Sequence, residues 1–258
     1  MLAKRSLLVV AHPGHELMLF GWLREARPQI VVLTDKESGA TRSSLDLTRK
    51  VAETAGAFVV DTVAFEEAEL FDMLLQVRTD RLERFVHELA DLIARECIEQ
   101  VVSDAAEGYH PVHDLSAALV RAAIALHTRR NPDLPVEHLE YHVVGDPRPD
   151  EDRQEMQRVV LSDAILHRKL EWIREYATEL GPLMLSEVEC LLDAYGDEAY
   201  RFEVLGRAGV EQVRLFDGLR HYEKREEQLK AENLIDRQVL RHARHMAAVE
   251  EKLHASIK

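Results

Sequence analysis

Short apolar runs alternate with amphipathic stretches along the chain up to Val144. A short apolar run bounded by Gly, Pro or polar residues is typical of a buried strand. Such runs predict strands at Ser6–Val10, Ile30–Leu33, Ala57–Val60, Glu99–Ser103 and Val136–Val144. Apolar residues at helical spacing predict helices between them, at Leu17–Glu25, Leu45–Ala55, Asp80–Glu96 and Leu115–His127. This alternation predicts an α/β fold, a mostly parallel sheet of about five or more strands flanked by helices, in the order 3-2-1-4-5.

The pattern is less regular elsewhere. Thr62–Thr79 mixes acidic and apolar residues, and a short helix and a lid-like excursion both fit it. Beyond Gly145 the composition shifts, with a loop of prolines and acids, a long helix at Leu161–Leu180 and a charged helical region at Ser186–Lys258. Ile235–Ile257 carries a narrow apolar stripe, which we expect to pack on the domain or on a second chain. The stripe consists of Val239, Met246, Val249, Leu253 and Ile257.

Composition limits the classes of partner. The chain has 258 residues, of which 46% are hydrophobic, so it can bury a sizeable core. Its net charge of -14 argues against binding to nucleic acid or to anionic membranes. The first apolar run is too short for a signal peptide, and we expect a cytoplasmic protein. The two cysteines, Cys97 and Cys190, are predicted to be buried free thiols, and their number excludes a zinc site made of cysteines.

Two loops share the pattern His-Pro-x-His-acid. The first, His12–Glu16, follows the first predicted strand, and the second, His110–Asp114, follows the fourth. Strands one and four are adjacent in the predicted order, so both loops are expected at the edge where α/β sheets bind ligands. Imidazole nitrogens are ligands that zinc prefers, and a catalytic zinc site leaves one position for water. The loops therefore predict a zinc site held by His12, His15 and His113, with His110 near the metal without binding it.

The two loops also resemble those of a known family. AHPGHE resembles the AHPDDE loop of the PIG-L/LmbE-like zinc-dependent de-N-acetylases, and YHPVHD resembles their HPDH loop. Ser162–Tyr176 and Asp193–Leu205 are similar to later segments of the family, so the resemblance covers about residues 5–205. It implies a Rossmann-like fold, one zinc ion, and hydrolysis of an N-acetyl group from an amino sugar or its conjugate. We accordingly expect an α/β domain at 1–205 and a helical C-terminal extension at 206–258, which offers a possible route to a homo-oligomer.

The resemblance assigns roles to individual residues. His12 and His113 match zinc ligands of the family, and His15 stands in the place of an aspartate ligand. His110 matches the histidine that assists at the tetrahedral intermediate. Arg42 lies where the family often keeps an arginine that binds the substrate.

The sequence departs from the family at the general base. Gly14 stands in the place of the aspartate that deprotonates the attacking water, and Val112 also replaces an aspartate. Such a base typically contributes about 10²–10⁴ in rate. Three explanations stay open: a nearby carboxylate, Glu16 or Asp114, substitutes; zinc alone generates the hydroxide for an easier substrate; or the site only binds.

We therefore expect a metal-dependent hydrolase that deacetylates an N-acetylated amino sugar or a related small amide, with His110 and Glu16 as its catalytic residues. The alternative is a catalytically impaired homologue that binds a metal or a sugar. A third possibility is an interaction protein that uses its charged C-terminal helices. If the pocket is otherwise intact and the backbone tolerates a side chain, Gly14→Asp is expected to raise turnover.

Overall fold

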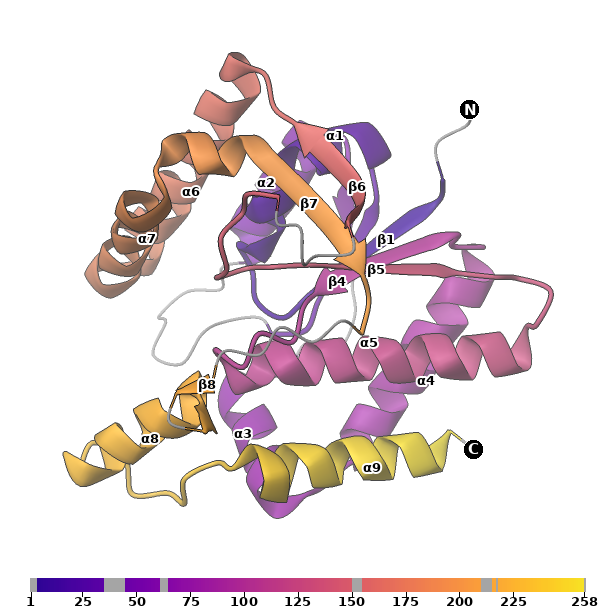
Figure 1. Ribbon diagram of the computed structural model, residues 1–258. Helices are drawn as coiled ribbons and strands as arrows, with labels where there is room; N and C mark the ends of the chain where they lie inside the picture. Colours follow the sequence, from indigo (N-terminus) through magenta and orange to yellow (C-terminus); the bar gives the residue numbers. More distant parts are fainter. Residues whose placement is uncertain are drawn as a thin grey trace.

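The computed structural model describes residues 4–34, 45–60, 65–149, 155–209, 215–216 and 218–257. Its centre is a seven-stranded sheet in the order β3-β2-β1-β4-β5-β7-β6 (Figure 1). The strands are β1 Ser6–Val10, β2 Gln29–Val32, β3 Phe58–Val59, β4 Gln100–Asp104, β5 Glu137–Tyr141, β6 Glu155–Val160 and β7 Phe202–Arg207. β1 to β5 are parallel, so the predicted α/β class and the order 3-2-1-4-5 are confirmed.

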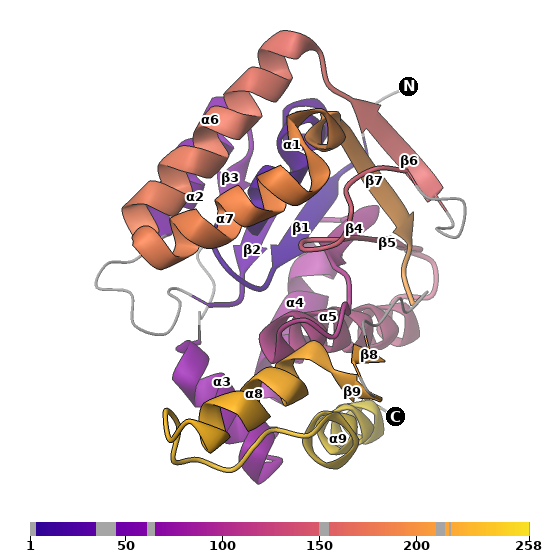
Figure 2. The same ribbon diagram turned by 60° about the vertical axis from the view of Figure 1, so that its left-hand side comes forward.

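Helices cover both faces of the sheet (Figure 2). Side chains of a strand alternate between the two faces, and in β1 Leu7 and Val9 enter one core while Leu8 and Val10 enter the other. The core of Leu7 includes side chains of α3 Glu67–Gln76, α4 Asp80–Arg95, α5 Pro111–Arg130 and α9 Ala247–Ser256. The opposite core includes side chains of α1 Phe20–Ala26, α2 Leu45–Ala55, α6 Asp163–Leu180 and α7 Pro182–Tyr195.

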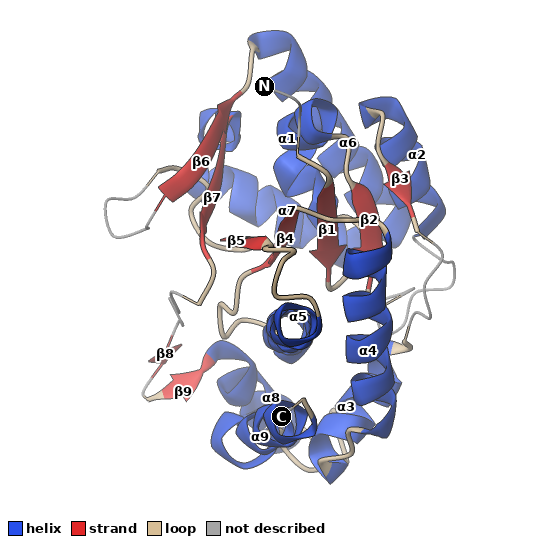
Figure 3. Ribbon diagram, turned by 90° about the vertical axis from the view of Figure 1, so that its right-hand side faces the viewer, coloured by secondary structure: helices blue, strands red, loops and turns tan. Residues whose placement is uncertain are grey.

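The four described strands after β5 were not predicted from the sequence. β6 and β7 pair antiparallel, and β7 also pairs antiparallel with β5, at the end of the sheet farthest from β3 (Figure 3). β6 is an edge strand whose Met156 and Val160 are exposed, so it lacks the apolar alternation of a half-buried strand. β7 falls in the region predicted to be helical, as does the short pair β8 Leu215–Phe216 and β9 Leu219–Arg220, and that prediction is wrong for these segments.

The C-terminal region packs on the chain itself. The predicted helix at Ile235–Ile257 begins only at His242, with a π-helical turn His242–Met246 that continues into α9; α8 His221–Ala231 precedes them. Met246, Val249 and Leu253 of the predicted stripe are buried in the same core as α4 and α5. The stripe is therefore used in cis. Among the described helices, none is both long and apolar enough to span a membrane.

The prediction that both cysteines are buried is wrong. Cys97 and Cys190 are exposed. Cys97 has a φ of 49° in the turn after α4, where the chain leaves the helix, and the buried positions beside it are Ile93 and Ile98. Cys190 lies on α7, which buries Leu192 instead. Apolar neighbours in the sequence therefore did not show whether the cysteine side chain itself faces the core or the solvent.

This exposure gives a testable expectation. We expect two thiols per chain to react with a chromogenic disulfide reagent in the native protein, since reactivity requires access to the thiol. The count in denaturant should be the same, and Cys97→Ser should lower both counts by one. A native count that rises on denaturation would contradict the exposed positions.

Candidate metal centre

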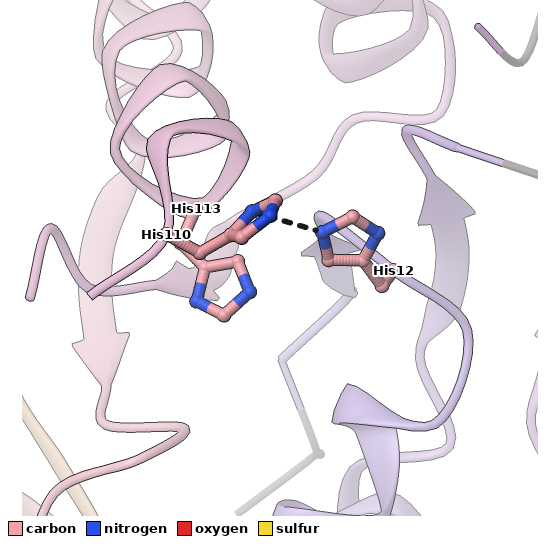
Figure 4. Close-up of side chains that lie close together, drawn as sticks. All are labelled: His12, His110 and His113. Atoms are coloured by element: carbon pink, nitrogen blue, oxygen red, sulfur yellow. Dashed lines mark hydrogen bonds between the residues drawn. The ribbon is translucent and has the colours of Figure 1, made fainter. Parts of the chain in front are cut away.

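The two histidine loops lie at one edge of the sheet. β1 and β4 are adjacent and parallel, with Val9 opposite Ser103, so the segments that follow them start side by side. His12 lies in the loop after β1, and His110 and His113 lie at the start of α5 (Figure 4). His110 caps that helix, because its Nδ1 accepts a hydrogen bond from the Val112 N–H at 3.4 Å. The expected meeting of the two loops is thus observed.

Four imidazole rings form one cluster. The contacting pairs have ring centroids between 4.5 and 5.3 Å apart, and they involve His12, His15, His110 and His113. Ring nitrogens of His12, His110 and His113 all lie within 4.8 Å of one another. His15 is not part of that set, although its ring is 4.5 Å from that of His113. The described geometry therefore brings His110 into the group where the sequence analysis expected His15.

Burial keeps two rings of this cluster, those of His12 and His113, in the form that binds metals. His12 and His113 are 3% and 5% exposed. Desolvation lowers the pKa of both rings well below the usual value for histidine, and the neighbouring histidines lower it further. Because a metal binds the neutral imidazole, these shifts remove the competition from protons at neutral pH.

Two rings are oriented by partners behind them. The Thr34 hydroxyl lies 2.9 Å from His12 Nδ1. Asp104 Oδ2 accepts hydrogen bonds from the Ala11 N–H at 2.7 Å and from His15 Nδ1 at 2.8 Å. Outer partners of this kind fix the orientation and tautomer of histidines that bind metals.

Glu67 is a site residue that the sequence analysis missed. It is the first residue of α3, it is buried, and its Oε1 lies 3.1 Å from His110 Nε2. The sequence places it in Thr62–Thr79, the stretch of mixed acidic and apolar residues. The available signal was an acid at the start of a helix, which the helix dipole favours in any case. Nothing in the sequence indicated that Glu67 would lie beside His110.

The two carboxylates considered as substitute bases hold their own loops. Glu16 is fully buried, its Oε2 accepts a hydrogen bond from the Gly14 N–H at 2.7 Å, and burial raises the pKa of its carboxyl group. Asp114 accepts from the Gly108 N–H at 3.0 Å and pairs with Arg220. Arg42 lies outside the described residues.

The space beside Gly14 is filled. Gly14 has a φ of 96°, and a Cβ there would lie 2.5 Å from Cε1 of Tyr176. Tyr176, on α6, donates a hydrogen bond from its hydroxyl to the Pro13 carbonyl oxygen, which holds the ring in place. This finding overturns the condition under which Gly14→Asp was expected to raise turnover.

The C-terminal region is attached to the second loop. The His221 ring stacks on Tyr109 with centroids 4.4 Å apart, and its Nδ1 lies 3.3 Å from the Tyr109 carbonyl oxygen. The buried Arg220 contacts Asp114 with one nitrogen and His242 Nε2 with another, at 3.0 Å. Residues on both sides of the pair His110 and His113 are therefore anchored by segments about a hundred positions later.

No protein-family model matches the chain, and no curated protein does. Among solved structures, the conserved protein TT1542 from Thermus thermophilus is 19% identical, with a TM-score of 0.56 over 83% of this chain and 97% of that one. A40926 pseudoaglycone deacetylase Dbv21 is 16% identical, with a TM-score of 0.49 over 81% and 99%. The zinc-inhibited form of teicoplanin deacetylase Orf2 is 11% identical, with a TM-score of 0.46 over 81% and 100%.

The likeness to TT1542 concerns the fold. The chain is thus an α/β protein of that fold with a buried histidine cluster at the carboxyl edge of its parallel strands.

Proposed function

We propose that the chain is a zinc-dependent hydrolase that removes the acetyl group from an N-acetylated amino sugar or a related small amide. The observation that carries this proposal is the buried cluster in which nitrogens of His12, His110 and His113 lie within 4.8 Å of one another. The resemblance of the loops AHPGHE and YHPVHD to the PIG-L/LmbE-like de-N-acetylases supplies the substrate class.

The residues present fit a metal ion. Imidazole nitrogens are typical ligands of zinc. In the described part of the chain, Nδ1 of His113 is buried without a hydrogen-bond partner, and such a group normally has one. When bound, zinc would supply a Lewis acid and lower the pKa of a water molecule to about 7.

The proposal gives each residue a task. His12 and His113 hold the metal in both candidate ligand sets, the one predicted from the sequence with His15 and the one whose nitrogens lie together with His110. Glu16 keeps its predicted role as the base, because it is the carboxylate nearest in the sequence to Gly14, from whose N–H it accepts a hydrogen bond, and Gly14 stands where the family it resembles has its base. Arg42 keeps its predicted role in binding the substrate. A small sugar-like molecule is the expected partner, and a cytoplasmic location stays a prediction.

The proposal predicts metal-dependent release of an amine. Protein loaded with zinc should produce free amine from a panel of N-acetylated amino sugars, measured by an amine-reactive fluorophore. A strong chelator should remove the activity, because the proposed centre supplies the hydroxide, and added zinc should restore it. Protein that binds zinc but cleaves none of a broad panel of amides and esters would favour the alternative, a catalytically impaired homologue that binds a metal or a sugar.

A further inference from the structure

We propose that Glu67 is the positioning residue that makes His110 a ligand of the metal centre, through Nδ1. This inference rests on the proposed function only in that a metal ion binds at the histidine cluster. It assigns a role to a carboxylate from α3, an element outside both histidine loops.

The hydrogen bonds of Thr34 select the tautomer of His12. The Thr34 hydroxyl donates its hydrogen to the Ala11 carbonyl oxygen at 2.8 Å. Towards His12 Nδ1, at 2.9 Å, the hydroxyl oxygen is therefore an acceptor. Nδ1 of His12 carries the proton, and Nε2 presents its lone pair to the centre of the cluster.

The Glu67 carboxylate selects the tautomer of His110. An ionised carboxylate only accepts hydrogen bonds, so Glu67 Oε1, at 3.1 Å, selects the form of His110 that is protonated on Nε2. The opposite nitrogen, Nδ1, is then unprotonated, and its single lone pair, which receives the long 3.4 Å contact from the Val112 N–H, is the one that a bound metal would take over. Glu67 therefore decides which nitrogen of His110 is available to a metal.

These two lone pairs face each other. His12 Nε2 and His110 Nδ1 are 3.5 Å apart (Figure 4). That distance is long for a hydrogen bond. Zinc–nitrogen bonds of about 2.0–2.1 Å at tetrahedral angles separate two ligand nitrogens by about 3.4 Å, so the observed spacing suits a shared cation. His113, whose buried Nδ1 has no hydrogen-bond partner among the described residues, completes the group.

The position of Glu67 is itself well defined. Phe71 lies one turn later on the same face of α3, and its ring is 5.9 Å from that of His110 in an edge-on arrangement. The Arg237 guanidinium in turn lies over the Phe71 ring, 4.4 Å from its centroid. α3 thus contacts His110 through two side chains, the Glu67 carboxylate as a hydrogen-bond acceptor and the Phe71 ring.

Metal affinity measured without substrate tests the inference. Loss of an outer partner typically weakens metal binding about 10–100-fold, and we expect this for Glu67→Ala in a zinc competition assay with a chromogenic chelator. Glu67→Gln should lose less, because its amide oxygen can accept the same hydrogen bond. Glu66→Ala is the matched control, since Glu66 is exposed, adjacent, and has no side-chain capping bond. His110→Ala should weaken zinc binding more than His15→Ala does.

The tautomer provides a second readout. Long-range ¹⁵N correlation spectra of metal-free protein should show His110 protonated on Nε2, and zinc should shift its Nδ1 resonance; Glu67→Ala should alter both.

Unchanged zinc affinity in folded Glu67→Ala, or a wild type that binds no zinc, would overturn the inference. If Glu67→Ala weakens zinc binding but the wild type cleaves no amide, the hydrolase proposal fails and this inference stands. If the wild type is an active hydrolase whose zinc affinity is unchanged by Glu67→Ala, the hydrolase proposal stands and this inference fails.

Discussion

His12→Ala and His113→Ala are each expected to lose zinc and, with it, all measurable turnover. Both residues belong to both candidate ligand sets, so neither set survives the change. Wild-type protein should carry about one zinc per chain, the stoichiometry of a single site of this kind. Removal of a direct ligand should cost more than the 10–100-fold loss typical of an outer partner.

Elemental analysis of the purified variants measures this effect. His167→Ala is the matched control, since His167 is an exposed histidine on α6 whose ion pair among the described residues is with Glu171, at 3.1 Å. Because both ligands are buried, each variant should also be unfolded in urea beside metal-free wild type, so that loss of metal is separated from loss of fold. Full zinc content in both variants would contradict the assigned centre.

The alternation of strands and helices was sufficient to predict the sheet from β1 to β5. Each of these strands is bounded by clear breaks, and β1 and β4 are buried along their whole length, which makes their apolar runs visible in the sequence. The adjacency of β1 and β4 then follows from topology, and with it the meeting of His12 and His113. The predicted order and the joining of the two loops rest on this signal.

Contacts between distant segments could not be predicted in the same way. Glu67 approaches His110 from a helix that the sequence left undecided, and Arg220 reaches Asp114 across 106 positions. Such pairs depend on how helices pack over the sheet edge, and no periodicity within either segment encodes them. The exposed edge strand β6 was missed for a related reason, since its pairing with β7 leaves little apolar pattern.

Gly14 illustrates why a motif alone misjudges a site. The comparison of AHPGHE with AHPDDE indicates a missing base, which Gly14→Asp would restore if the pocket had room. The structure places the Tyr176 ring in that room, with Cε1 2.5 Å and Cζ 2.6 Å from where the Cβ would lie. Tyr176 is buried and bonded to the Pro13 carbonyl oxygen, so the ring cannot withdraw without losing that bond.

Gly14→Asp is therefore expected to destabilise the protein and to leave turnover no higher than in the wild type. Overpacking typically costs about 1–3 kcal/mol. The φ of 96° at Gly14 adds backbone strain, which is of order 1–3 kcal/mol for a residue with a side chain. Urea unfolding measures the sum.

The clash and the strain can then be separated at Gly14 itself. In a Tyr176→Ala background the ring is absent, and Gly14→Asp should cost less stability than it does in the wild type, by about the overpacking component of 1–3 kcal/mol. An equal cost in both backgrounds would show that Tyr176 is not the obstacle. A gain in amine release by the double variant over Tyr176→Ala would mean that the aspartate now reaches the centre. The Tyr176 ring beside Gly14 would then be what keeps an acidic side chain out of that position.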